Sequence, residues 1–153
     1  MFRENPNGVY CMHGGGDRVD AKPRILIVDD EADFLFSASV VLRREGYEVT
    51  EAANGEEALS MIQEYRRAGK RIDLVLTDLR MPILCGLELL EALGELGIDI
   101  PVIAVTGYSD DALRADLKRK GCTEFLEKPF EPVDLVKRVR KTLRNVALLG
   151  EGK

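Results

Sequence analysis

Acidic residues follow two of the short apolar runs in this sequence. The run 25–28 leads directly into Asp29, Asp30 and Glu31, and a second run ends at Asp78. Adjacent carboxylates repel one another, so such a cluster is costly unless positive charge lies among them. Carboxylate oxygens without His or Cys partners are typical ligands of a hard divalent cation, Mg²⁺ or Mn²⁺.

A hydroxyl and an amine follow the later runs. Thr106 ends one run and Lys128 follows another. Lys128 could neutralise a phosphoryl oxygen as a point charge, and Thr106 could donate a hydrogen bond to a second oxygen. Asp78 stands alone after its run, and carboxylates act as phosphoryl acceptors by forming aspartyl phosphates. Each residue alone has an ordinary explanation as a helix cap or a solvated charge, but their convergence favours a site.

Five apolar runs must position these residues. Most are nearly continuous and rich in β-branched side chains, as in parallel strands that are buried on both faces. The runs are 25–28, 47–52, 73–77, 101–106 and 124–126. Amphipathic stripes between them predict helices, so the chain reads as five β–α units with a parallel sheet between two helical layers. Ligands of such sheets bind at the carboxyl ends of the strands.

Capping residues support the helix boundaries. Asn54 is a plausible N-cap of the second helix, and Ser109 of the fourth. Glycines are expected to stop the second, third and fourth helices. They are Gly69, Gly97 and Gly121.

Length and composition narrow the class of protein. A chain of 153 residues, 45% hydrophobic and 32% charged, is expected to form one soluble domain over 23–148. Residues 1–22 are predicted to be a disordered leader, and 149–153 a C-terminal tail. The net charge of −5 argues against nucleic acid or an anionic membrane as the main partner. Without a signal pattern or a long apolar run, we expect a cytoplasmic protein whose three cysteines are reduced.

The spread of motifs resembles one known family. These motifs are "VDDE" (28–31), "DLRMP…GLELL" (78–82 and 86–90), "VTG" (105–107) and "EKPF" (127–130). They look like the receiver domain of bacterial two-component response regulators, over roughly residues 24 to 147. The resemblance implies a flavodoxin-like (βα)5 fold, a doubly wound parallel sheet with strand order 2-1-3-4-5.

The resemblance also implies a role for each site residue. Asp78 is the expected phosphoacceptor. Asp30 and the backbone carbonyl of Arg80 join it as Mg²⁺ ligands, and Asp29 helps through water. Lys128 is expected to contact the phosphoryl group, with a cis bond to Pro129. Thr106 and Phe125 are the expected switch pair, although Phe125 also fits a core aromatic.

Two positions near the site are open to interpretation. Arg80, two residues after Asp78, could stabilise the phosphoryl group, hinder an attacking water, or simply face solvent. Tyr108, two residues after Thr106, could limit access to the site or merely cover the loop. Cys85 stands where many receivers carry Asp, and a small residue in a turn is the default interpretation.

The implied partners are proteins. A sensor histidine kinase or a histidine phosphotransfer protein supplies the phosphoryl group, because this chain has no Walker-type nucleotide loop. Transfer switches the surface of the fourth helix, fifth strand and last helix, which then controls a downstream output protein. The basic last helix is interpreted as a solvated face rather than as a nucleic-acid surface. A homodimer through the fourth and last helices is compatible with the pattern, but their faces are not hydrophobic enough to predict it.

Two other functions fit the same architecture. A flavodoxin-type cofactor binder needs a Gly-, Ser- or Thr-rich phosphate loop after the first strand, where this chain has three carboxylates. A phosphatase with an aspartyl nucleophile usually needs a second acid two residues later, where this chain has Arg80.

Overall fold

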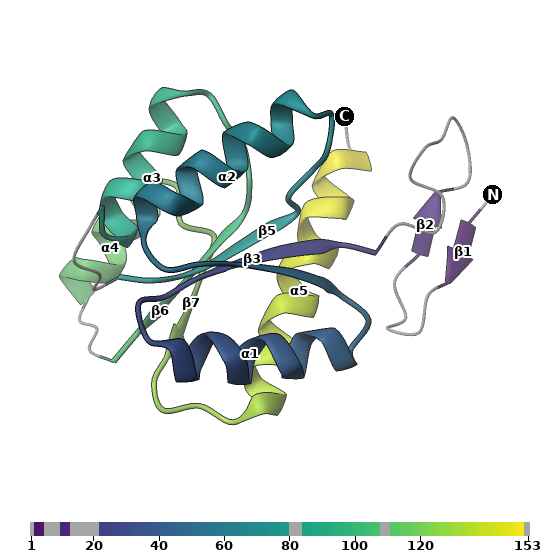
Figure 1. Cartoon of the computed structure of the whole chain (residues 1–153), viewed down its shortest axis with the longest axis horizontal. Coiled ribbons are helices and arrows are strands. Elements are labelled where there is room, and N and C mark those ends of the chain that lie inside the picture. The colour runs from purple at the N-terminus through teal and green to yellow at the C-terminus, as the bar shows by residue number, and fades with distance from the viewer. Residues whose placement is uncertain (1, 5–9, 13–21, 80–83, 108–110, 152–153) are drawn as a thin grey trace.

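A five-stranded parallel sheet forms the centre of the molecule (Figure 1). The structure is a computed structural model that describes residues 2–4, 10–12, 22–79, 84–107 and 111–151. The strands of the sheet are β3 (Arg24–Val28), β4 (Glu48–Ala52), β5 (Leu74–Asp78), β6 (Val102–Thr106) and β7 (Glu124–Glu127). Their spatial order is β4-β3-β5-β6-β7. Counted within this sheet, the order is 2-1-3-4-5, so the predicted fold class is confirmed.

Helices cover both faces of the sheet (Figure 1). They are α1 (Ala32–Arg44), α2 (Gly55–Arg67), α3 (Gly86–Glu95), α4 (Asp111–Arg119) and α5 (Pro132–Glu151). Because side chains alternate along a strand, β3 sends Ile25 and Ile27 to the α1 and α5 face, and Leu26 and Val28 to the α2, α3 and α4 face. Both faces of the sheet are therefore buried beneath helices, which explains why the apolar runs are nearly continuous.

The cap and stop residues fit the helix boundaries where they are described. Asn54 accepts a hydrogen bond at 2.8 Å from the backbone N–H of Glu57 and so caps α2. Gly69, Gly97 and Gly121 follow α2, α3 and α4 with φ of 74°, 69° and 100°, a conformation that glycine adopts without strain. Ser109, the expected cap of the fourth helix, lies outside the described residues.

The two ends of the chain differ from the expected pattern. Two three-residue strands, β1 (Phe2–Glu4) and β2 (Tyr10–Met12), pair antiparallel within the segment where no regular structure is expected. No periodic apolar pattern marks such short strands. At the other end α5 continues through Glu151, three residues beyond the predicted boundary at 148. The assignment of 1–22 as a separate leader stays a prediction.

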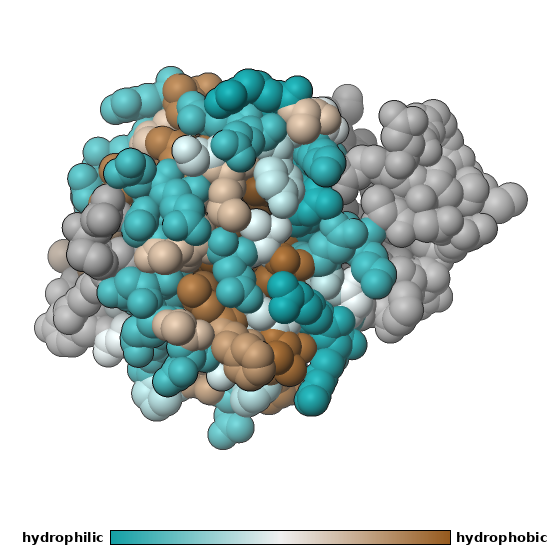
Figure 2. Space-filling view, viewed as in Figure 1, coloured by the Kyte–Doolittle hydropathy of each residue, from teal (hydrophilic) through white to brown (hydrophobic). Residues whose placement is uncertain are grey.

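Few large hydrophobic side chains are exposed among the described residues. Figure 2 shows a largely hydrophilic face with hydrophobic residues gathered in part over α1. Phe36 of α1 is the most exposed large hydrophobic side chain described, at 70%. In the described part of the chain, no helix combines the length and apolar character that a bilayer crossing requires.

The register of the strands places the expected site residues at the same edge of the sheet. Val28 pairs with Thr77, Asp78 with Val105, and Thr106 with Glu127. Neighbouring strands therefore end side by side at the carboxyl edge of the sheet. The residues that follow them emerge together there.

Candidate functional site

Three carboxylates meet at the carboxyl edge of the sheet. One oxygen from each of Asp29, Asp30 and Asp78 lies within 4.8 Å of the others, and we call these residues the acidic cluster. Asp29 is fully buried, Asp78 is 9% exposed and Asp30 is exposed. The all-oxygen donor set fits a hard divalent ion such as Mg²⁺. The cluster thus has the chemistry that the sequence predicts for Mg²⁺ or Mn²⁺.

The buried position of Asp29 disfavours its charge. Desolvation raises the pKa of this carboxyl, and the negative charges of Asp78 and Glu31 act in the same direction. Two contacts oppose the rise: the backbone N–H of Glu31 donates to Oδ1 of Asp29 at 2.8 Å, and the Lys128 ammonium is near. The cluster is therefore electrostatically unfavourable without further positive charge.

Lys128 supplies part of that charge from the end of β7. Its Nζ lies 3.5 Å from Oδ2 of Asp29, 3.8 Å from Oδ2 of Asp78 and 3.8 Å from Oε1 of Glu31. The backbone N–H of Lys128 donates to the carbonyl of Thr106 at 2.8 Å, which ties this loop to β6. The bond from Lys128 to Pro129 is cis, as the resemblance implies.

The backbone around Asp78 is closely packed. Gly86 begins α3, and a Cβ atom there would lie 2.7 Å from the backbone oxygen of Asp78 and 3.1 Å from Cα of Leu79. Real Cβ atoms do not approach backbone this closely, so only glycine fits without movement. The N-terminus of α3 is thereby held against the segment that carries Asp78. Sequence reasoning used Gly86 only as part of a motif and did not identify this contact.

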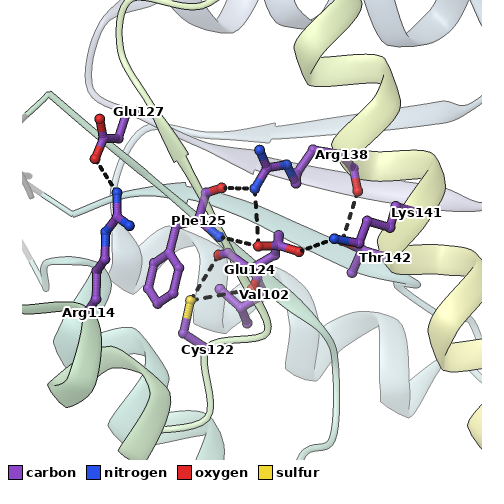
Figure 3. A network of polar contacts seen from close by, with 9 residues as sticks. All are labelled: Val102, Arg114, Cys122, Glu124, Phe125, Glu127, Arg138, Lys141 and Thr142. Atoms are coloured by element: carbon purple, nitrogen blue, oxygen red, sulfur yellow. Dashed lines mark hydrogen bonds and ion pairs between the residues drawn. The ribbon is translucent and has the colours of Figure 1, made fainter. Parts of the chain in front are cut away.

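The expected switch residues lie on adjacent strands. Thr106 is buried at the end of β6, and half-buried Phe125 of β7 packs on the core beneath α3 and α4. In Figure 3 the Arg114 side chain of α4 reaches toward β7, where it contacts Glu127 and lies 5.9 Å from the centre of the Phe125 ring. Phe125 is thus a core aromatic that also contacts α4, so both interpretations of this residue remain compatible.

Three of the five basic residues of α5 form ion pairs within the chain. Arg138 and Lys141 contact the Glu124 carboxylate of β7 at 3.1 and 3.4 Å (Figure 3), and Arg140 contacts Glu45 at 2.7 Å. Pairing inside the chain lowers the positive charge that this helix presents outward. This observation supports the interpretation of α5 as a docked helix with a solvated face.

Some expected site residues cannot be placed, and some contacts were not expected. Arg80 and Tyr108 lie outside the described residues, so their roles stay predictions. The sequence does not indicate the contact of Lys128 with Glu31, which is also the N-cap of α1. Nor does it indicate that Lys128 Nζ lies 4.5 Å from the centre of the Phe34 ring, at the start of α1. The sequence pattern predicts which residues share the carboxyl edge of the sheet, but it does not resolve which side chains touch there.

Comparisons with known proteins agree with this geometry. The family model of the response regulator receiver domain matches residues 25–140. The transcriptional regulatory protein PrrA of Mycobacterium tuberculosis is 37% identical over 122 residues, which cover 80% of this chain and 50% of PrrA. Curated relatives such as PrrA and FixJ of Rhizobium meliloti are matched over about half of their length.

Solved structures give the same result. A CheY-like response regulator receiver domain protein from Methanospirillum hungatei has a TM-score of 0.73 and 34% identity, over 82% of this chain and 96% of that protein. The Vibrio cholerae chemotaxis protein CheY4 also has a TM-score of 0.73, with 31% identity over 80% and 99% of the two chains. This chain belongs to the response regulator receiver domain family of two-component systems.

Proposed function

We propose that this chain accepts a phosphoryl group on Asp78 from a phosphohistidine of a partner protein, in a reaction that requires Mg²⁺. The partner is a sensor histidine kinase or a histidine phosphotransfer protein. The observation that supports this function most directly is the position of the Asp78 carboxylate beside Asp29 and Asp30, with Lys128 Nζ 3.8 Å away. An oxygen of Asp78 attacks phosphorus, the phosphorus–nitrogen bond breaks, and its electron pair stays on the imidazole of the donor.

The residues of the chain have distinct roles in this transfer. Asp30, Asp78 and the backbone carbonyl of Arg80 would hold Mg²⁺, and Asp29 would act through water. When bound, the ion would neutralise phosphoryl oxygens and supply the positive charge that the acidic cluster needs. Lys128 neutralises a further phosphoryl oxygen, and Thr106 donates a hydrogen bond to another. The same groups serve the later hydrolysis, so the chain acts on its own phosphoryl group rather than as a conventional enzyme.

The output is a protein contact on the surface of α4, β7 and α5. Phosphorylation changes this surface only as far as it favours one of two states, and Thr106 and Phe125 couple the site to it. The contacts of Arg114 with β7 and of α5 with Glu124 lie on this surface, which supports its assignment as the switching region. We place the chain in the cytoplasm, where a histidine kinase domain acts.

Labelling by a small phosphodonor tests the proposal. The protein is incubated with acetyl phosphate, with and without Mg²⁺, and the mass and site of the adduct are measured by mass spectrometry. We expect at most one phosphoryl group per chain, located on Asp78 and dependent on Mg²⁺. Asp78→Asn should abolish labelling, whereas Asp99→Asn, at an exposed position outside the site, should not.

Two results would overturn this function. Equal labelling of the Asp78→Asn variant would exclude Asp78 as the acceptor. Many-turnover hydrolysis of a simple phosphomonoester by the wild-type chain would instead favour a phosphatase.

A further inference from the structure

The ammonium group of Lys128 lies on the face of an aromatic ring. Its Nζ is 4.5 Å from the centre of the Phe34 ring, on the first turn of α1. The Phe34 ring in turn meets Phe130 edge to face, with centres 6.1 Å apart and planes at 86°. The lysine loop and α1 therefore share a small aromatic contact beside the acidic cluster.

A lysine side chain does not by itself keep its ammonium group in one fixed position. Its stem has four rotatable carbons, and freezing it costs about 2 kcal/mol of rotamer entropy. The carboxylates of Asp29, Asp78 and Glu31 all attract Lys128 Nζ, but none approaches closer than 3.5 Å. Contacts of this length constrain direction weakly compared with short, charge-assisted hydrogen bonds.

A divalent cation would weaken the carboxylate contacts further. Positive charge bound among Asp29, Asp30 and Asp78 repels the ammonium and competes for the same oxygens. The face of an aromatic ring carries negative electrostatic potential. A cation bound to the carboxylates would not compete with Lys128 for this ring face. Phe34 thus offers Lys128 a contact that persists when the acidic cluster is filled.

We propose that Phe34 is a positioning residue, whose ring face holds the Lys128 ammonium beside Asp78 in the direction needed for phosphoryl transfer. This inference rests on the proposed function of Asp78 and adds a specific role for α1. The perpendicular contact with Phe130 limits rotation of the Phe34 ring, which helps to keep its face turned toward Nζ of Lys128. Half-buried Phe34 also packs on the core below α1, and the test must separate packing from the attraction between ring and cation.

Graded fluorination of one ring provides that separation. Successive fluorine atoms on Phe34 withdraw electron density and weaken cation binding, while shape and apolar packing change little. We expect the Mg²⁺-dependent rate of labelling by acetyl phosphate to fall stepwise with fluorination. Phe34→Leu, which removes the ring, should lower the rate by about threefold to tenfold.

Phe36→Leu is the matched control. It makes the same substitution two positions along α1, at a side chain that is 70% exposed. We expect this variant to label at the wild-type rate. A small donor is used so that docking of a partner protein does not enter the comparison.

A double-mutant cycle links the effect to the ammonium group. In a Lys128→Ala background, Phe34→Leu should cause no further loss of rate. An undiminished loss there would show that Phe34 acts without Lys128. Unchanged labelling of Phe34→Leu, or a rate insensitive to fluorination, would also overturn the role of Phe34 while Asp78 remains the acceptor.

Nuclear magnetic resonance examines the contact independently of phosphorylation. The ring current of Phe34 should shift the ε-methylene protons of Lys128 upfield, and Phe34→Leu should remove this shift. An unshifted Lys128 signal in the wild type would refute the contact itself. If the shift is present but the wild type is not labelled by acetyl phosphate, the proposed function fails and the positioning role fails with it.

Discussion

Asp29 carries its charge at a fully buried position. Burial raises the pKa of this carboxyl above the ordinary value of 3.8, so folding favours its protonated form. At neutral pH the ionised side chain therefore weakens the fold unless positive charge compensates it. A neutral isostere would avoid this electrostatic cost.

Asp29→Asn should accordingly stabilise the protein when divalent ions are removed. The amide keeps an oxygen for the backbone N–H of Glu31 but carries no charge, so we expect the free energy of unfolding at pH 7 to rise by about 1 kcal/mol. Urea unfolding in the presence of a chelator measures this change. Asp30→Asn is the control, since Asp30 is exposed and should change stability little. A less stable Asp29→Asn variant would contradict the prediction.

Cys122 should be unreactive despite being a free thiol. The side chain is 7% exposed, its thiol donates to the carbonyl of Glu124 at 3.1 Å, and burial raises its pKa to about 11. At pH 8 only about one thiol in a thousand is then ionised. The thiolate fraction should grow about tenfold for each pH unit until the pH reaches that pKa.

Alkylation followed by peptide mapping measures the reactivity of the Cys122 thiol. At pH 8 the native protein should be modified at half-buried Cys85 well before Cys122. In denaturant, where burial is lost, both cysteines should react at similar rates. Equal labelling of the two in the native protein would be inconsistent with a buried, protonated Cys122.

The elements of the sheet and the helices could largely be predicted from sequence. Strands such as β3 are buried on both faces, which leaves an unmistakable apolar run, and caps such as Asn54 act within three residues. Contacts between elements could not be predicted. The distance from Phe34 to Lys128 depends on how the first turn of α1 lies against the loop that follows β7. The fit of Gly86 depends on the path of the chain after Asp78.

The junction of α3 with β5 should be sensitive to a single methyl group. Gly86→Ala would place Cβ against the backbone of Asp78, so α3 must shift. We expect a loss of about 1–3 kcal/mol in stability, as for other overpacked sites, and slower labelling of Asp78. Thermal unfolding and acetyl phosphate labelling report these two effects.

Gly94→Ala is a control on the same helix. Nothing lies within 4 Å of a Cβ at this position, so alanine should be neutral or stabilising by up to about 1 kcal/mol through helix propensity. Labelling should be unchanged. If both alanine variants behave alike, the close approach at Gly86 has no functional importance.

For the whole molecule, the acidic cluster should couple metal binding to stability. An ion that binds only the folded chain stabilises it by about 2.7 kcal/mol at a concentration one hundred times its dissociation constant. Mg²⁺ should therefore raise the midpoint of thermal unfolding, while KCl of equal ionic strength should not. Asp30→Asn should lose most of this gain, and Asp29→Asn less, because Asp30 is the expected direct ligand. A larger loss in Asp29→Asn than in Asp30→Asn would make Asp29 the direct ligand instead of Asp30.

The direction of the chain through the sheet has a practical consequence. β3 begins at the amino edge of the parallel sheet, and α5 runs back from the site and ends on the side where β3 begins (Figure 1). Residues 24 and 151 therefore both lie away from the edge that carries Asp78. A tether or reporter attached next to either residue should leave the acidic cluster open to a donor. Immobilised protein would then be suitable for measuring phosphoryl transfer in real time.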